Sequence, residues 1–241
     1  MVSLTGFLFM TFAVVVSAAP GCRPPVIPTL PKTGADELAA PPANLVLKKI
    51  AIGHGIQNYS CESITSTSKA TGAVAVLYDA TSLYPGTKRS GISQRDWESL
   101  PSRLLWNKPL PLNKLAGTKY GADPEKPFPD PADLRLQGMP TVKFLGHHFF
   151  DINSIPVFDL SAAGLKAIVG KTGNVNAPSR ADKGILGTGA VQWLELADKG
   201  ESQGLKLVYR VITAGGVQQA CSVAGAGVQS VPYTTFYWFY G

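Results

Sequence analysis

The sequence predicts an all-β protein, a single-domain β-sandwich or barrel of about 8–10 strands with a long irregular insertion that carries a short helix. Short β-rich segments recur along the chain and are separated by turn-forming residues. Charged residues make up only 16% of the chain, whereas glycine and proline number 25 and 19. Strands and helices do not alternate, which argues against a parallel α/β fold. This composition is typical of a secreted β protein.

The N-terminus predicts secretion. Residues 4–16 are almost entirely apolar and are followed by small residues at 17–19, so residues 1–18 form a predicted signal peptide, with mature chain starting near Ala19. An uncleaved membrane anchor is the alternative, although the apolar run is shorter than the roughly 20 residues that a span needs. Residues 19–43 form a proline-rich leader, and no later segment is apolar enough to cross a bilayer. We therefore expect a secreted protein, extracellular or in the cell wall.

The predicted β domain covers residues 44–241. Its first two strands are separated by Gly53-His54-Gly55, which resembles a turn, and Gly215-Gly216 marks a hairpin turn. The aromatic run 236–240 places large side chains on both faces, as in a strand buried between two layers. The predicted strands are 45–52, 56–61, 73–80, 141–152, 155–161, 164–172, 189–198, 204–213 and 228–241.

Residues 81–140 form a long insertion within this domain. Within it, 93–105 predict a short helix that begins at Ser93, with acidic residues in its first turn. Pro101 is expected to break or kink that helix, because proline lacks the backbone N–H. Irregular excursions of this length are unusual in compact domains, and such loops are often functional or disordered.

The sequence contains three cysteines, Cys22, Cys61 and Cys221. An oxidising compartment favours one disulfide, and three pairings are open. We favour Cys61–Cys221, because both residues lie beside strand-like segments. Cys22 lies in the leader and is left free, paired with another chain, or exchanged for one of the other two.

Several segments in this order resemble domain-of-unknown-function family 3455, which occurs in filamentous fungi and bacteria. These segments are GIQNYSC (55–61), AVLYDAT (75–81), LGHHFFD (145–151), PVFDL (156–160), VQWLELADKG (191–200), VYRVITAGGVQQAC (208–221) and VPYTTFYWFYG (231–241). The resemblance implies a secreted, mostly β protein without an established activity. Such proteins are sometimes labelled malate dehydrogenase. The present sequence does not support that activity, because it has no G-x-G-x-x-G after a first strand.

The histidines are the first candidates for chemistry, in particular the adjacent pair His147 and His148. Successive side chains of a strand point to opposite faces, so only one of the pair faces a given site, unless Gly146 forms a bulge. The plainer interpretation is one core histidine and one exposed histidine. A metal ion would be held by His54 with one of the pair, and its oxygen ligands would come from Asp151, Glu62 or Asp79.

Carbohydrate chemistry is a second possibility. Val191, Trp193 and Glu195 are predicted to share one strand face, and a tryptophan beside a carboxylate suits sugar binding. Asp79, Asp151, Asp159 and Glu195 are the carboxylates from which a glycosidase pair would be drawn. The G-x-S-x-G motif of serine hydrolases is absent from the sequence.

Three function classes remain. The favoured one is a non-enzymatic extracellular binding or surface-associated protein, whose partner is a glycan, a small ligand or a protein, with cell-wall polysaccharide included. The alternative is a secreted enzyme, metal-dependent or hydrolytic, that uses the histidines and nearby carboxylates. The third is a structural wall protein. The net charge of +6 is scattered, so nucleic-acid binding is not expected. No cofactor is predicted beyond the metal ion considered above.

Overall fold

The computed structural model describes residues 1–2, 26–87 and 90–241. Most of the predicted signal peptide lies outside these residues, and so does the start of the leader, which contains Cys22. No helix in the described part of the chain is both long and apolar enough to cross a membrane.

Eight antiparallel strands form a closed barrel, in which each strand pairs with the next along the chain and β8 pairs with β1. This confirms the predicted all-β class. Of the two predicted forms, sandwich and barrel, the chain adopts the barrel. The strands are β1 (Leu47–Cys61), β2 (Lys69–Asp79), β3 (Lys143–Phe150), β4 (Pro156–Leu160), β5 (Leu165–Val175), β6 (Trp193–Asp198), β7 (Leu207–Gly215) and β8 (Gly227–Tyr240).

The predicted turn at residues 53–55 is wrong, because these residues lie inside the single long strand β1. Gly53 and Gly55 point into the barrel, where neighbouring chain comes very close. A Cβ atom on Gly53 would lie 2.7 Å from the ring of Tyr237. A Cβ atom on Gly55 would collide with the carbonyl oxygen of Val74 and lie 2.5 Å from Ala75 Cα. The two glycines therefore serve close packing rather than a change of direction.

Side chains fill the barrel interior. Leu77, Phe158, Tyr237 and Phe239 belong to one buried cluster, and the hydroxyl groups of Tyr233 and Tyr237 lie 2.9 Å apart. Eight strands enclose a space just wide enough for such side chains. Because the interior is packed, a binding site is expected on the outer surface.

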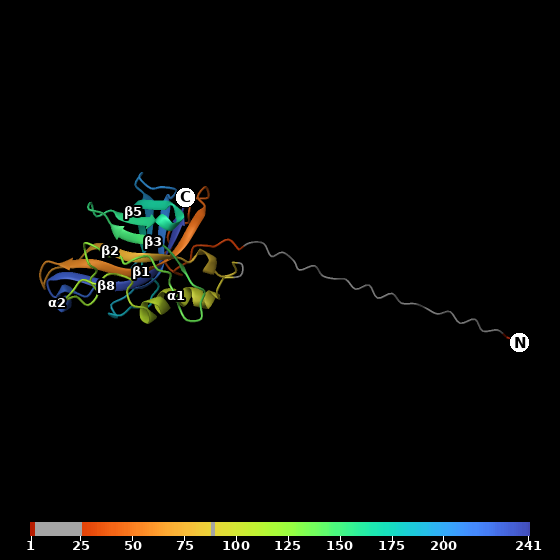
Figure 1. Ribbon diagram of the computed structural model, residues 1–241, viewed down its shortest axis with the longest axis horizontal. Helices are drawn as coiled ribbons and strands as arrows, with labels where there is room; N and C mark the ends of the chain where they lie inside the picture. The colour runs from red at the N-terminus through yellow and green to blue at the C-terminus, as the bar shows by residue number, and fades with distance from the viewer. Residues whose placement is uncertain (3–25, 88–89) are drawn as a thin grey trace.

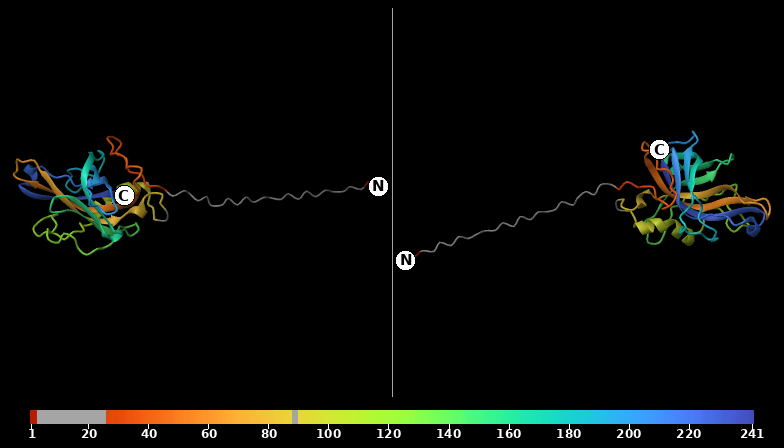
Figure 2. Two further views of the ribbon diagram at one scale, coloured as in Figure 1. Left: turned by 90° about the horizontal axis from the view of Figure 1, so that it is seen from above. Right: turned by 180° about the vertical axis from the view of Figure 1, so that it is seen from behind.

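A second apolar cluster covers part of the outside of the barrel. Helix α1 (Gln94–Asn107) lies along β7 and β8, below the barrel in Figure 1 and again in the right-hand view of Figure 2. Its Trp97 stacks on Phe236 of β8 with ring centroids 4.0 Å apart. Within residues 231–240 of β8, the outward side chains are thus as buried as the inward ones, which confirms the prediction for the aromatic run 236–240.

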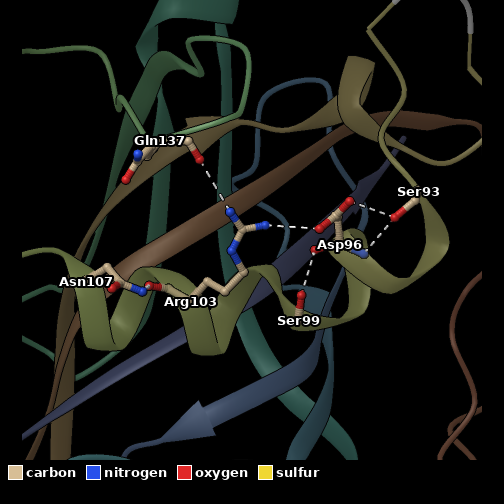
Figure 3. Close-up of polar contacts among 6 residues, drawn as sticks. All are labelled: Ser93, Asp96, Ser99, Arg103, Asn107 and Gln137. Carbon is tan, nitrogen blue, oxygen red and sulfur yellow. Dashed lines mark hydrogen bonds and ion pairs between the residues drawn. The ribbon is translucent and has the colours of Figure 1, made fainter.

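Helix α1 begins where the sequence predicts. Ser93 accepts a hydrogen bond from the backbone N–H of Asp96, and Arg103 pairs with Asp96 and donates to the Gln137 carbonyl (Figure 3). Of the predicted break or kink at Pro101, the break does not occur, because the helix continues to Asn107. Packing compensates for the missing N–H: Pro101 is buried, and its carbonyl accepts a hydrogen bond from the Thr234 hydroxyl.

The leader and the insertion both lie against the barrel. Leu30 and Leu38 of the leader pack on the outer apolar cluster, and the Tyr209 hydroxyl donates to the Ala39 carbonyl at 3.0 Å. The insertion also contains the 3₁₀ helix η1 (Thr81–Leu83), and a second one, η2 (Ser161–Ala163), follows β4. The leader and the insertion therefore cover part of the outer face of the barrel.

The β7–β8 connection is longer than the predicted Gly215-Gly216 turn. β7 ends at Gly215, and residues 216–226, including the short helix α2 (Cys221–Ala224), precede β8. The connection carries Cys221, which is bonded to Cys61 at the end of β1, with Cα atoms 5.6 Å apart. The favoured pairing of the three cysteines is therefore the one in the structure.

We expect removal of this disulfide to lower the free energy of unfolding by about 3 kcal/mol, because the bond closes a loop between residues 160 positions apart. The measurement is urea unfolding of a Cys61→Ala/Cys221→Ala double variant beside the wild-type chain. The double change leaves no new partner for Cys22. A midpoint equal to that of the oxidised wild type would contradict the prediction.

Candidate functional site

The adjacent histidines lie on opposite faces of β3. Leu77 pairs with Gly146 and Tyr78 with Phe144, so the strand has a bulge at Leu145–Gly146, where the sequence allows one. The bulge shifts the alternation by one residue, and as a result His148 points into the barrel and His147 points outward. No single site receives both side chains.

His148 is part of the barrel interior. Its ring stacks on Phe158 with centroids 4.0 Å apart, and Nδ1 lies 2.8 Å from the carbonyl oxygen of Val157, to which it donates in the neutral ring. Burial lowers the pKa of His148 to about 4, despite the hydrogen bond to Val157. His148 is therefore the core histidine of the plainer interpretation.

His54 points outward from β1 but is also buried, with 2% of its surface exposed. It pairs with Thr234, whose hydroxyl is bonded to Pro101 of α1, so the helix covers this part of the sheet. Burial lowers the pKa of His54 to about 3. Val76 of β2 lies between His54 and His147 in the sheet register.

The candidate metal ligands are not assembled into one site. Asp151 accepts hydrogen bonds from the backbone N–H groups of Asn153 and Ile155 and so closes the β3–β4 turn. Glu62 pairs with Lys69 on the surface. Within residues 26–87 and 90–241, no group of three or more His, Cys, Asp and Glu side chains is placed to hold a metal ion.

The carboxylates considered for glycosidase chemistry are also dispersed. Asp79 pairs with Lys49 at 2.6 Å; burial raises its pKa, but hydrogen bonds from Lys49 and Thr81 outweigh this and hold the pKa below its usual value. Asp159 lies opposite His147 on β4, and Glu195 accepts from the Thr172 hydroxyl at 2.8 Å. Asp79 and Glu195 therefore have structural partners of their own, and the three carboxylates lie on different strands.

His147 lies in an aromatic groove between the insertion and the strands β1, β2, β3 and β8. The ring of Phe128, from the insertion, stacks on His147 with centroids 3.9 Å apart and meets Phe149 edge-on at 6.4 Å. Burial lowers the pKa of His147, although the nearby Asp159 carboxylate raises it, so the ring stays neutral at pH 7. The groove has a volume of about 1270 Å³, and its aromatic lining consists of Tyr120, Phe128, His147, Phe149 and Phe150.

The rim of the aromatic groove combines apolar and polar groups. Leu115 is 40% exposed and Val228 is 78% exposed. Asn58, Lys119 and Gln229 also line the groove, and the Lys119 ammonium lies 5.1 Å from the centre of the Tyr120 ring. Half-buried aromatic rings beside amide and ammonium groups form a surface that can stack on a ligand and hydrogen-bond its edges.

Trp193 and Glu195 share the outer face of β6, as the sequence predicts, beneath the leader. Trp193 is buried in the outer apolar cluster, and Glu195 pairs with Tyr209 of β7. Val191 does not share this face, because it precedes β6 and packs into the barrel interior. The tryptophan is thus part of a covered layer rather than an exposed sugar platform.

Sequence reasoning missed most of the groove. Phe149 could have been predicted from the sequence, because strand alternation places it on the same outward face of β3 as His147. Phe128 and Tyr120 lie in the proline-rich insertion, where no periodic pattern indicates which strands they approach. The clearest available signal was Pro127-Phe128-Pro129, an aromatic side chain held between two prolines.

The fold and this surface define an antiparallel eight-stranded β-barrel protein whose outer face carries an aromatic groove. The chain belongs to the family described as protein of unknown function (DUF3455), whose model matches residues 41–241. Neither the curated proteins nor the solved structures contain a match to this chain.

Proposed function

We propose that this protein is a non-enzymatic extracellular binding protein that holds a polysaccharide chain in the aromatic groove. The observation that carries the proposal is the collection of five aromatic side chains in one open groove. Sugar rings present apolar C–H faces that stack on aromatic rings, while their hydroxyl groups bond amides and charged groups at the edges. Asn58 and Lys119 supply such groups here.

The shape of the groove favours a chain over a single small molecule. Its volume of about 1270 Å³ exceeds the range of roughly 300–1,000 Å³ usual for small-ligand pockets. The enzymatic alternative has less support. His148 lies in the barrel interior and His54 is covered by α1, so neither joins His147 at the surface. Asp151 and Asp79 are engaged in structural contacts.

The test is binding of soluble glycans to the secreted protein, with β-1,3-glucan, chitin oligomers, cello-oligosaccharides and pectin fragments as probes. We expect at least one probe to bind. We expect a His147→Ala/Phe149→Ala double variant to bind it about ten-fold more weakly, because each stacked ring is worth roughly 0.5–1.5 kcal/mol. Isothermal titration calorimetry measures both affinities.

Trp106→Ala is the matched control, because Trp106 is an exposed aromatic residue (57%) on α1, outside the groove. This variant should bind like the wild type. The proposal fails if none of the probes binds, or if the double variant, shown to be folded by its thermal melt, binds as tightly as the control.

A further inference from the structure

A smaller cavity lies apart from the aromatic groove, between α1, the leader and strands β6 and β7. It has a volume of about 280 Å³, and its wall includes Lys32, Ser102, Arg180, Asp182, Trp193 and Ile212. At roughly 30 Å³ per water in the liquid, this is the space of about nine waters. A cavity of this size suits one small molecule.

The wall of this cavity contains a strained residue. Ile212 has a φ of 49°, in the left-handed region that β-branched side chains avoid. The strain accompanies a bulge, because the pairing of β7 with β8 shifts between Val211 and Ala214. Thr213, within the bulge, is buried and donates to the Val191 carbonyl. Backbone outliers of this kind cluster at sites that bind ligands.

Among the charged groups of the cavity wall, one carboxylate has several hydrogen-bond partners, whereas two cations form no ion pair within the described part of the chain. The Asp182 carboxylate accepts from the Ser102 hydroxyl, from Trp106 Nε1 at 2.7 Å and from the Gly184 N–H at 2.8 Å. Neither Lys32 nor Arg180 forms an ion pair with any residue that the structure describes. Two cations of the cavity wall are thus available to an anionic group.

The same wall limits how much negative charge a ligand can carry. Glu98 and Asp182 are both carboxylates of the lining, and they would repel a second anionic group. They can instead accept hydrogen bonds from ligand hydroxyls. A ligand with one carboxylate and several hydroxyl groups satisfies both the cations and the carboxylates.

We propose that this cavity binds a sugar acid, a monosaccharide-sized molecule with a single carboxylate that lies between Lys32 and Arg180. The leader contributes Lys32 and so forms one wall of the site. This proposal is independent of the aromatic groove, which none of these residues lines.

The test is titration calorimetry of the full secreted chain with three probes, glucuronate, glucose and succinate. We expect glucuronate to bind, and glucose, which lacks the carboxylate, to bind at least ten-fold more weakly. Succinate, with two carboxylates, should also bind at least ten-fold more weakly. A Lys32→Gln/Arg180→Gln double variant should lose roughly ten-fold or more in glucuronate affinity, the usual size for charged hydrogen bonds.

Lys171→Gln is the control, because Lys171 is exposed on β5 and lines neither the cavity nor the groove. It should leave glucuronate binding unchanged. The proposal is overturned if glucuronate does not bind, if glucose or succinate binds equally well, or if the double variant matches the control. All the changed side chains are exposed, so the variants should fold, which their thermal melts would verify.

Discussion

Lowering the pH from 7 to 4.5 is expected to reduce the free energy of unfolding by about 5 kcal/mol. The cause is the pair of buried histidines, His54 and His148. Burial lowers their pKa values from 6.5 to about 3 and about 4, respectively. Both rings are therefore neutral in the folded protein throughout this interval.

The direction of the effect follows from proton binding. Below pH 6.5 the unfolded chain binds a proton at each of these histidines, whereas the folded chain does not until the pH approaches 4 for His148 and 3 for His54. Acid therefore favours the unfolded state, and stability rises with pH between these values. Above about pH 5 the interval lies clear of the ordinary pKa values of aspartate and glutamate, so the slope there reports mainly on histidine.

The measurement is urea unfolding at several pH values between 7 and 4.5. Two histidines give a slope that approaches about 2.7 kcal/mol per pH unit, and each single variant, His54→Gln or His148→Gln, should remove about half of it. The slope is the readout, because either substitution also changes stability at pH 7. His147→Gln is the control, since this half-buried ring should contribute less. Equal slopes in all four proteins would contradict the assignment.

The strands with a regular apolar–polar alternation, and the helix capped by Ser93, could be predicted from the sequence. β2 and β7 show a regular exchange of apolar faces, and Ser93 with Asp96 defines the start of α1. The eightfold closure is different, because it depends on pairing between β1 and β8, at opposite ends of the chain. No local pattern encodes that contact, so sandwich and barrel could not be distinguished.

The errors have a common physical origin. Gly53, Gly55 and Pro101 were interpreted from backbone preference alone, as a turn and as a break or kink of the helix. In the folded chain, tertiary contacts dominate: the glycines admit Tyr237 and β2, and Pro101 is buried and bonded through its carbonyl to Thr234. Local preference is a weak guide where the chain is in close contact with distant segments.

Both candidate sites depend on segments that lie outside the barrel strands. The insertion supplies Phe128 and Tyr120 to the groove and α1 to the cavity, and the leader supplies Lys32. The histidine pair raised the strongest chemical expectation, yet only His147 reaches a surface site, as an aromatic ring rather than as a metal ligand. The barrel thus acts as a rigid support, and the connecting segments determine what it can bind.

Gly55→Ala is expected to lower the free energy of unfolding by about 4 kcal/mol, near the upper limit for a single substitution. The added methyl group would collide with the carbonyl oxygen of Val74 and lie 2.5 Å from Ala75 Cα. Both obstacles are backbone atoms of β2, which is held by β1 and β3 on either side, so they cannot move aside as a side chain would.

Gly170→Ala on β5 is the matched control. Its Cβ atom would lie 3.6 Å from the flexible side chain of Lys199, and the backbone of Gly170 has no positive φ. The same chemical change should therefore be neutral or stabilise by up to about 1 kcal/mol, because alanine restricts the unfolded chain. Urea midpoints of the two variants measure the contrast. If Gly55→Ala were as stable as Gly170→Ala, the close approach of β1 to β2 at Gly55 would be contradicted.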